Sequence, residues 1–79
     1  MKINYDKSAD AAYIYLIADD QIVSGWVKKT YYCDPVEIDG MINLDFNSGG
    51  VLGGIEILDA SKKLPQQLLD GALRIDINS

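Results

Sequence analysis

The sequence predicts an α+β domain: an antiparallel β-meander of five to six strands with one short helix in its C-terminal region. Apolar and polar residues alternate with a period of two over most of the chain, which is typical of strands. Clusters of glycine, asparagine and aspartate separate these segments, and one later stretch changes to helical spacing. Because the chain has 79 residues, we expect a single domain, residues 1–79.

The first part of the chain predicts two strands joined by a turn. Ile3 and Tyr5 alternate with polar neighbours, and residues 7–10 predict a turn. Residues 11–17 are apolar on both faces, so we expect a central strand that is covered on both sides or faces a subunit interface. Residues 22–32 alternate less regularly, with glycine at a candidate bulge position, and residues 33–40 predict a loop.

The middle of the chain predicts a β-hairpin. Residues 41–46 and 51–58 alternate on either side of Asn-Ser-Gly-Gly, where glycine supplies the positive φ that tight turns need. A two-residue turn at 49–50 pairs Leu44 with Ile55, so the apolar side chains of both strands share one face.

The C-terminal region predicts one short helix and a last strand. Ser61 is a candidate cap, and Pro65 suits the first helical turn. An apolar stripe at helical spacing follows, formed by Leu64, Leu68, Leu69 and Ala72. Residues 73–77 alternate again and predict the strand.

The charge balance and the missing residue types exclude several functions. The chain has 7 basic and 12 acidic residues, no histidine and one cysteine. The acidic net charge argues against nucleic-acid binding and is compatible with a basic protein partner. Without histidine, the commonest general base and zinc ligand are absent. We expect no catalytic residue, no metal site and no cofactor.

The sequence also predicts a cytoplasmic location. A lone cysteine cannot form an intrachain disulfide, which favours a reducing compartment. The N-terminus has no apolar signal-peptide core, and no apolar run approaches the ~20 residues that span a bilayer. We therefore expect no membrane association.

Residues 45–56 nearly match the spacing of a calcium-binding loop, but the hairpin register argues against calcium. In that register Glu56 lies about four strand residues, ~13 Å, from Asn47, which is too far to share an ion. The register places Asp45, Asn43 and Glu56 on one face. Two carboxylates on one face suit either acid–base chemistry or a solvated polar surface, and both interpretations stay open.

Aromatic and aliphatic residues point to an interface. A single short helix cannot cover a sheet of this size, so we predict a homodimer. Its candidate interface residues are Tyr13, Tyr15, Ile17 and Trp26. The same aromatic side chains are the alternative basis for a small-ligand site.

Two segments resemble a known family. Residues 5–16 resemble the pattern Y-D-x-x-x-D-A-x-Y-I-x-L of domain of unknown function 2283, a family of small prokaryotic proteins. Residues 44–61 resemble its L-D-[YF]-D-x-x-G-x-x-x-G-I-E-I-L-x-A-S, with Asn47 where aspartate is common. The resemblance implies a compact β-rich domain with a terminal helix and no established activity. The occurrence of family members beside small toxin-like genes implies an antitoxin-like role.

These patterns lead to one functional prediction and two alternatives. The prediction is a non-catalytic protein-interaction module. The alternatives are an enzyme or metal-dependent site built on Asp45 and Glu56, and a small-ligand site on the aromatic face. The candidate functional or structural motif residues are Tyr5, Asp6, Asp10, Asp45 and Glu56.

Overall fold

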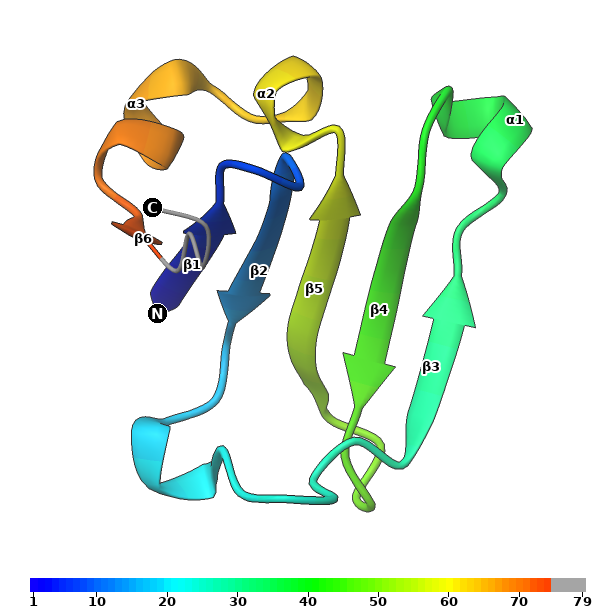
Figure 1. Ribbon diagram of the computed structural model, residues 1–79. Helices are drawn as coiled ribbons and strands as arrows, with labels where there is room; N and C mark the ends of the chain where they lie inside the picture. The colour runs from blue at the N-terminus through cyan, green and yellow to red at the C-terminus, as the bar shows by residue number, and fades with distance from the viewer. Residues whose placement is uncertain (75–79) are drawn as a thin grey trace.

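A computed structural model, which describes residues 1–74, confirms the α+β fold with a meander-like antiparallel sheet (Figure 1). The strands are β1 (Lys2–Asp6), β2 (Ala11–Tyr15), β3 (Lys29–Tyr32), β4 (Ile42–Phe46), β5 (Leu52–Leu58) and β6 (Leu73–Arg74). The helical segments are the 3₁₀ turn η1 (Asp19–Gln21), α1 (Pro35–Ile38), α2 (Ala60–Lys63) and α3 (Gln66–Asp70). None of these helices is long and apolar enough to cross a membrane.

The strands form one sheet in the order β3-β4-β5-β2-β1-β6. Strands β1 to β5 pair antiparallel, whereas the short β6 runs parallel to β1. The predicted last strand is present as β6, and its expected continuation over 75–77 lies outside the described residues. The sheet is therefore two antiparallel units, β1-β2 and β3-β4-β5, joined where β2 pairs with β5.

The turn between β4 and β5 differs from the predicted one. The Asn47 N–H donates to the Val51 carbonyl at 3.0 Å, so the loop has three residues instead of the expected two. The Gly50 N–H in turn donates to the Asn47 carbonyl at 3.0 Å, and Gly50 has a φ of 77°. A left-handed residue at the end of a three-residue loop is the usual geometry, because it returns the chain to the second strand.

A bulge in β5 compensates for the longer loop. Phe46 lies opposite Leu52, and Gly53 is an extra residue before the next pair. Beyond this bulge Leu44 lies opposite Ile55, which is the predicted register. The apolar positions of the two strands therefore share one face, as expected.

The helices are shorter and more numerous than predicted. Residues 61–72 form two helices instead of one, because Leu64 is extended, as residues before proline usually are, and Pro65 then precedes α3. Sequence reasoning also missed α1, where the Asp34 carboxylate accepts a hydrogen bond from the Val36 N–H at 2.9 Å.

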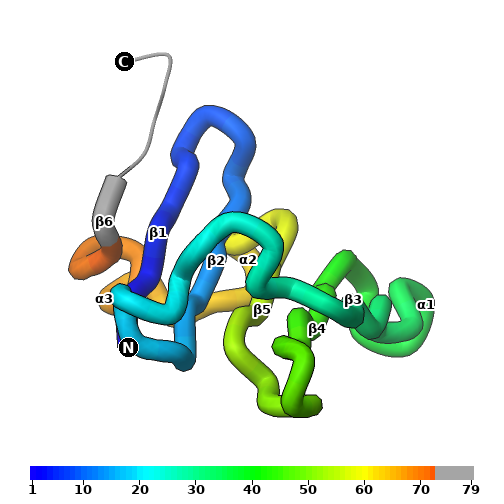
Figure 2. The backbone as a smooth tube through the Cα atoms, turned by 90° about the horizontal axis from the view of Figure 1, so that it is seen from below, coloured from blue at the N-terminus to red at the C-terminus, as the bar shows by residue number. Residues whose placement is uncertain are grey.

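The segment between β2 and β3 is mostly irregular. Only 29–32 of the loosely alternating 22–32 form a strand. Figure 2, which looks at the sheet from below, shows this segment crossing the end of the sheet to reach β3 at the far edge. Its Trp26 ring and the Ile17 side chain pack against Gly53, which is buried.

Alternation gives the sheet two different faces. Tyr5, Ala12 and Ile57 lie opposite one another on neighbouring strands and pack with Ala60 of α2 and Leu69 of α3 to form the buried core. We call this side the helix face. The other side, which we call the polar face, has mostly polar and tyrosine side chains, namely Asn4, Tyr13, Tyr15, Thr30, Tyr32, Asn43, Asp45 and Glu56.

Candidate functional site

The polar face brings together side chains from the two segments with the family-like pattern. Tyr13 of β2 lies opposite Glu56 of β5, and Glu56 lies opposite Asn43 of β4. Asp45 lies one pair further along the same face, opposite Gly54. The prediction that Asp45 and Glu56 share a face therefore holds, because the predicted register is the observed one.

Asp45 is the centre of a hydrogen-bond network. Its Oδ2 accepts a hydrogen bond from the Tyr13 hydroxyl at 2.5 Å, and its Oδ1 accepts one from the Thr30 hydroxyl at 2.6 Å. One carboxylate thus links three strands, β2, β3 and β4. Burial raises the pKa of the Tyr13 phenol, and the hydrogen bond to Asp45 and the charge of that carboxylate raise it further. The phenol therefore stays protonated and acts as a donor.

Gly54 makes the Tyr13–Asp45 bond possible. The Tyr13 side chain reaches from β2 across β5 to a residue of β4. A Cβ atom at position 54 would collide with the Tyr13 hydroxyl and ring. Glycine at this strand position is thus explained by the close approach of an aromatic side chain.

Glu56 is held by the asparagine opposite it. Its Oε1 accepts a hydrogen bond from the Asn43 side-chain amide at 2.8 Å. Asn43 itself is only 8% exposed, so its amide needs such an acceptor. A neutral donor therefore holds Glu56 directly across the strand pair.

The geometry favours a structural use of these carboxylates over catalysis. Both oxygens of Asp45 and one oxygen of Glu56 already accept short side-chain hydrogen bonds. In the part of the chain that the structure describes, no three acidic or cysteine side chains gather closely enough to hold a metal ion.

The motif residues at the start of the chain form a second, separate cluster. Asp10 accepts hydrogen bonds from the Tyr5 hydroxyl at 2.7 Å and from the Ser61 hydroxyl at 2.7 Å. The Ser61 N–H also donates to Asp10 at 2.9 Å, and the Ala60 N–H donates to the Asp10 carbonyl at 2.9 Å. Asp10 therefore caps α2 from the β1–β2 turn, a role for which Ser61 was the predicted residue.

Asp6 stabilises the turn that follows β1. Its Oδ1 accepts hydrogen bonds from the Ser8 hydroxyl at 2.8 Å, the Ser8 N–H at 3.1 Å and the Ala9 N–H at 3.3 Å. This arrangement is an aspartate turn that satisfies backbone donors locally.

The four candidate interface residues lie around two neighbouring glycines of β5, Gly53 and Gly54. Tyr13 and Tyr15 lie on the polar face with their ring centroids 4.6 Å apart, and the Lys2 ammonium lies 5.1 Å from the Tyr15 ring centre. Ile17 and Trp26, by contrast, pack on the Gly53 bulge and are half-buried. The two tyrosines therefore contribute aromatic surface to the polar face, and their part in an interface stays a prediction.

Sequence reasoning missed the part that β3 plays. Thr30 belongs to the Asp45 network, yet the segment that contains it has no recognisable signature. The alternation around Thr30 and Tyr32 is only a weak signal of a strand. The pairing of β3 with β4 also depends on the loop and the helix that connect them.

Comparison with known proteins finds one family. The model of the family described as "Protein of unknown function (DUF2283)" matches residues 2–61, which include both clusters described above. Neither a curated protein nor a solved structure matches the chain.

Proposed function

Because the chain belongs to the DUF2283 family of proteins of unknown function, which assigns it no activity, we propose from its geometry that it is a non-catalytic protein-interaction domain. The observation that supports this proposal most directly is an edge of the sheet with exposed apolar side chains. Strand β3 ends the sheet and, within residues 1–74, pairs with β4 on one side. An uncovered edge strand is a template for another strand.

The backbone of β3 is arranged for such pairing. The Cys33 N–H donates to the Ile42 carbonyl at 3.0 Å, so in this register odd-numbered residues of β3 bond to β4. The N–H and C=O groups of Thr30 and Tyr32 consequently point to the open edge. A second strand could accept and donate hydrogen bonds at both residues.

Large apolar side chains gather along this edge. Tyr31 and Tyr32 are 56% and 68% exposed, and Val36 and Met41 close by are 87% and 47% exposed. These are four of the nine exposed large hydrophobic residues among those the structure describes. An apolar concentration beside an open strand is typical of an interaction site.

The partner that fits this edge best is a second copy of the chain. If two β3 strands pair antiparallel with Tyr31 opposite Tyr31 of the second copy, Thr30 lies opposite Tyr32 of that copy. The outward-pointing backbone N–H and C=O groups of the two strands then meet. The same register places Lys28 opposite Asp34 of the second copy, and both side chains are exposed. The salt bridge found within residues 1–74 joins Lys2 to Asp19, so the Lys28 ammonium is available for an ion pair between copies.

A basic protein partner, as an antitoxin-like role would require, would meet the α1 end of the molecule. Asp34, Glu37 and Asp39 are exposed around this helix, and the formal net charge of the chain is −5. In the proposed homodimer Asp34 faces Lys28 of the second copy, so a basic partner would compete for Asp34. Glu37 and Asp39 would stay available to it.

The test of self-pairing is the mass in solution of wild type and two variants at position 32. We expect sedimentation velocity to show a dimer whose population increases from micromolar to millimolar concentration. Tyr32→Pro removes an outward N–H without touching the β4 ladder and should give a monomer. Tyr32→Ala, the control, keeps that N–H and should lose only part of the affinity. A wild type that stays monomeric at millimolar concentration, or equal dimerisation by Tyr32→Pro, would contradict the proposal.

A further inference from the structure

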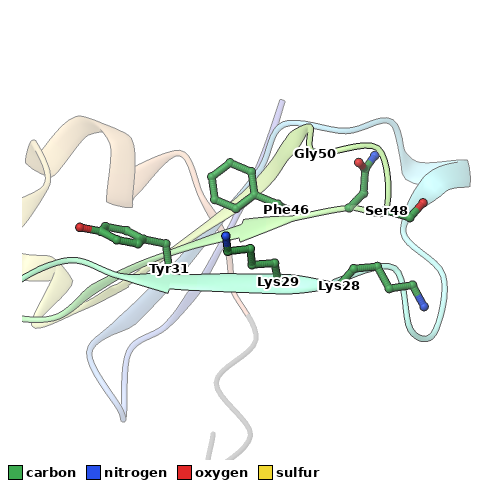
Figure 3. Close-up of a pocket in the computed structure, with 7 residues that line it drawn as sticks. Lys28, Lys29, Tyr31, Phe46, Ser48 and Gly50 are labelled. Carbon is green, nitrogen blue, oxygen red and sulfur yellow. The ribbon is translucent and has the colours of Figure 1, made fainter.

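The helix face has a region that α2 and α3 leave open. The buried core unites β1, β2 and β5 with these helices, whereas Tyr31 of β3 is largely exposed. A pocket of about 530 Å³ lies here, between β3 and the β4–β5 loop (Figure 3). Its lining residues are Lys28, Lys29, Tyr31, Phe46, Asn47, Ser48 and Gly50.

The register explains why two rings and an ammonium group meet in this pocket. Lys29 lies opposite Phe46, and Tyr31 lies one pair further along β3 on the same face. In Figure 3 the Lys29 side chain and the rings of Tyr31 and Phe46 lie on the same side of the sheet, while the Lys28 ammonium points away from them. Two aromatic rings therefore lie on the same face as the Lys29 ammonium.

The charge in this pocket is not neutralised by the protein. No carboxylate is among the lining residues, and Lys29 forms no ion pair within residues 1–74. Asp45, which directly precedes Phe46 in the sequence, points to the polar face, where Tyr13 and Thr30 occupy its oxygens. An ammonium group without a carboxylate partner can form a charge-assisted hydrogen bond with an anion.

The loop adds hydrogen-bond donors at the other end of the pocket (Figure 3). The Asn47 Oδ1 accepts hydrogen bonds from the N–H groups of Gly49 and Val51 at 2.9 and 3.0 Å. These bonds fix the side-chain amide and leave its Nδ2 as a donor for a ligand. The Ser48 hydroxyl is exposed at the rim of the same pocket.

From this arrangement we propose that the pocket binds a small aromatic carboxylate. The ring of the ligand would pack on Phe46 and Tyr31, and its carboxylate would accept a hydrogen bond from the Lys29 ammonium. The volume lies within the range of small-molecule sites in proteins, and such sites combine apolar walls with a few polar groups. The inference does not depend on dimerisation, since it uses side chains of the helix face and not the free backbone edge.

The test is an amide NMR titration of the full chain with three probes. Indole-3-acetate has the ring and the charge, indole-3-acetamide has the ring alone, and acetate has the charge alone. We expect saturable shifts for indole-3-acetate at Lys29, Tyr31 and residues 46–50. The other two probes should bind at least roughly tenfold more weakly. The titration is run at a protein concentration low enough for the chain to be monomeric, so that its outcome does not depend on whether the proposed dimer forms.

A pair of lysine variants tests the assigned cation. Lys29→Met keeps the apolar stem but removes the charge, and should weaken indole-3-acetate binding roughly tenfold. Lys7→Met, the control, makes the same change in net charge at the opposite end of the sheet and should leave binding unchanged. Absence of saturation, equal affinity for the amide probe, or equal effects of the two variants would each overturn the proposal.

Discussion

At the scale of single residues, Asp10 joins three parts of the chain through one side chain. It lies in the left-handed region with a φ of 50°, a conformation that aspartate tolerates better than most residues. Its carboxylate accepts hydrogen bonds from Tyr5 on β1 and Ser61 on α2. The Ser61 hydroxyl contributes most to lowering the pKa of Asp10, and the Tyr5 hydroxyl contributes next.

The lowered pKa predicts how Asp10 affects stability as the pH changes. The Asp10 carboxylate takes up its proton at a higher pH in the unfolded chain than in the folded chain. Its stabilisation is therefore complete above the ordinary pKa of 3.8 and is lost as the pH falls through the lower pKa of the folded state. Asp10→Asn keeps the turn but removes the charge. At neutral pH it should cost about 1 kcal/mol of unfolding free energy, which is modest because the site is exposed.

Urea unfolding at neutral and at strongly acidic pH measures this effect. The difference between wild type and Asp10→Asn should shrink in acid, where both side chains are neutral. Ser61→Ala, which removes a donor to the same carboxylate, should reduce the same acid dependence. An equal loss for Asp10→Asn at both pH values would show that the charge is not responsible.

At the scale of elements, the β4–β5 hairpin shows how two irregularities can cancel. Its loop is one residue longer than a tight turn, and the Gly53 bulge shifts the register back by one. The two neighbouring loop glycines have different roles, because the positive φ in this loop belongs to Gly50, at 77°. Gly49 needs no special conformation.

This difference predicts opposite results for two alanine variants. Gly50→Ala forces a side chain into the left-handed region and should cost about 1 kcal/mol. Gly49→Ala would place its Cβ 3.4 Å from the Asn47 Oδ1, which is ordinary contact, and should change stability by less than about 0.5 kcal/mol. Gly50→Asn should lie between them, because asparagine tolerates positive φ.

Chemical denaturation of the three hairpin variants at one pH gives the comparison. Equal losses for Gly49→Ala and Gly50→Ala would contradict the three-residue loop and favour the two-residue turn that the sequence suggested.

At the scale of the whole molecule, the sheet is covered on one face and open at β3. Its two faces differ in chemistry, with the helix-packed core on one and the Asp45 network on the other. The principal dimensions are 32, 31 and 22 Å, so a large part of the chain lies near the surface. Stability in such a small domain benefits from a partner.

The proposed β3 pairing therefore predicts a melting temperature that depends on protein concentration. Because dimerisation stabilises the folded state by mass action, the wild-type midpoint should rise with concentration in calorimetry. The midpoint of Tyr32→Pro should not. A wild-type midpoint that is constant from micromolar to millimolar concentration would contradict pairing in the folded state.

Much of the fold follows from local patterns in the sequence. Period-two alternation identifies β1, β4 and β5, because side-chain direction in a strand depends only on position along it. The apolar run over 11–17 identifies β2, and the same alternation places Asp45 and Glu56 on one face. The helices are harder to predict, since α1 is a single turn and Pro65 divides the later helical stretch.

The sequence by itself determined the strand periods, the β4–β5 register and the shared face of Asp45 and Glu56, all of which depend on neighbours a few residues away. Only the tertiary structure decided that β2 lies beside β5, that Tyr13 reaches Asp45 over Gly54, and that Asp10 caps α2. These contacts join residues separated by 32 and 51 positions. Such pairs form only when the whole sheet packs against its helices, so no local pattern can specify them.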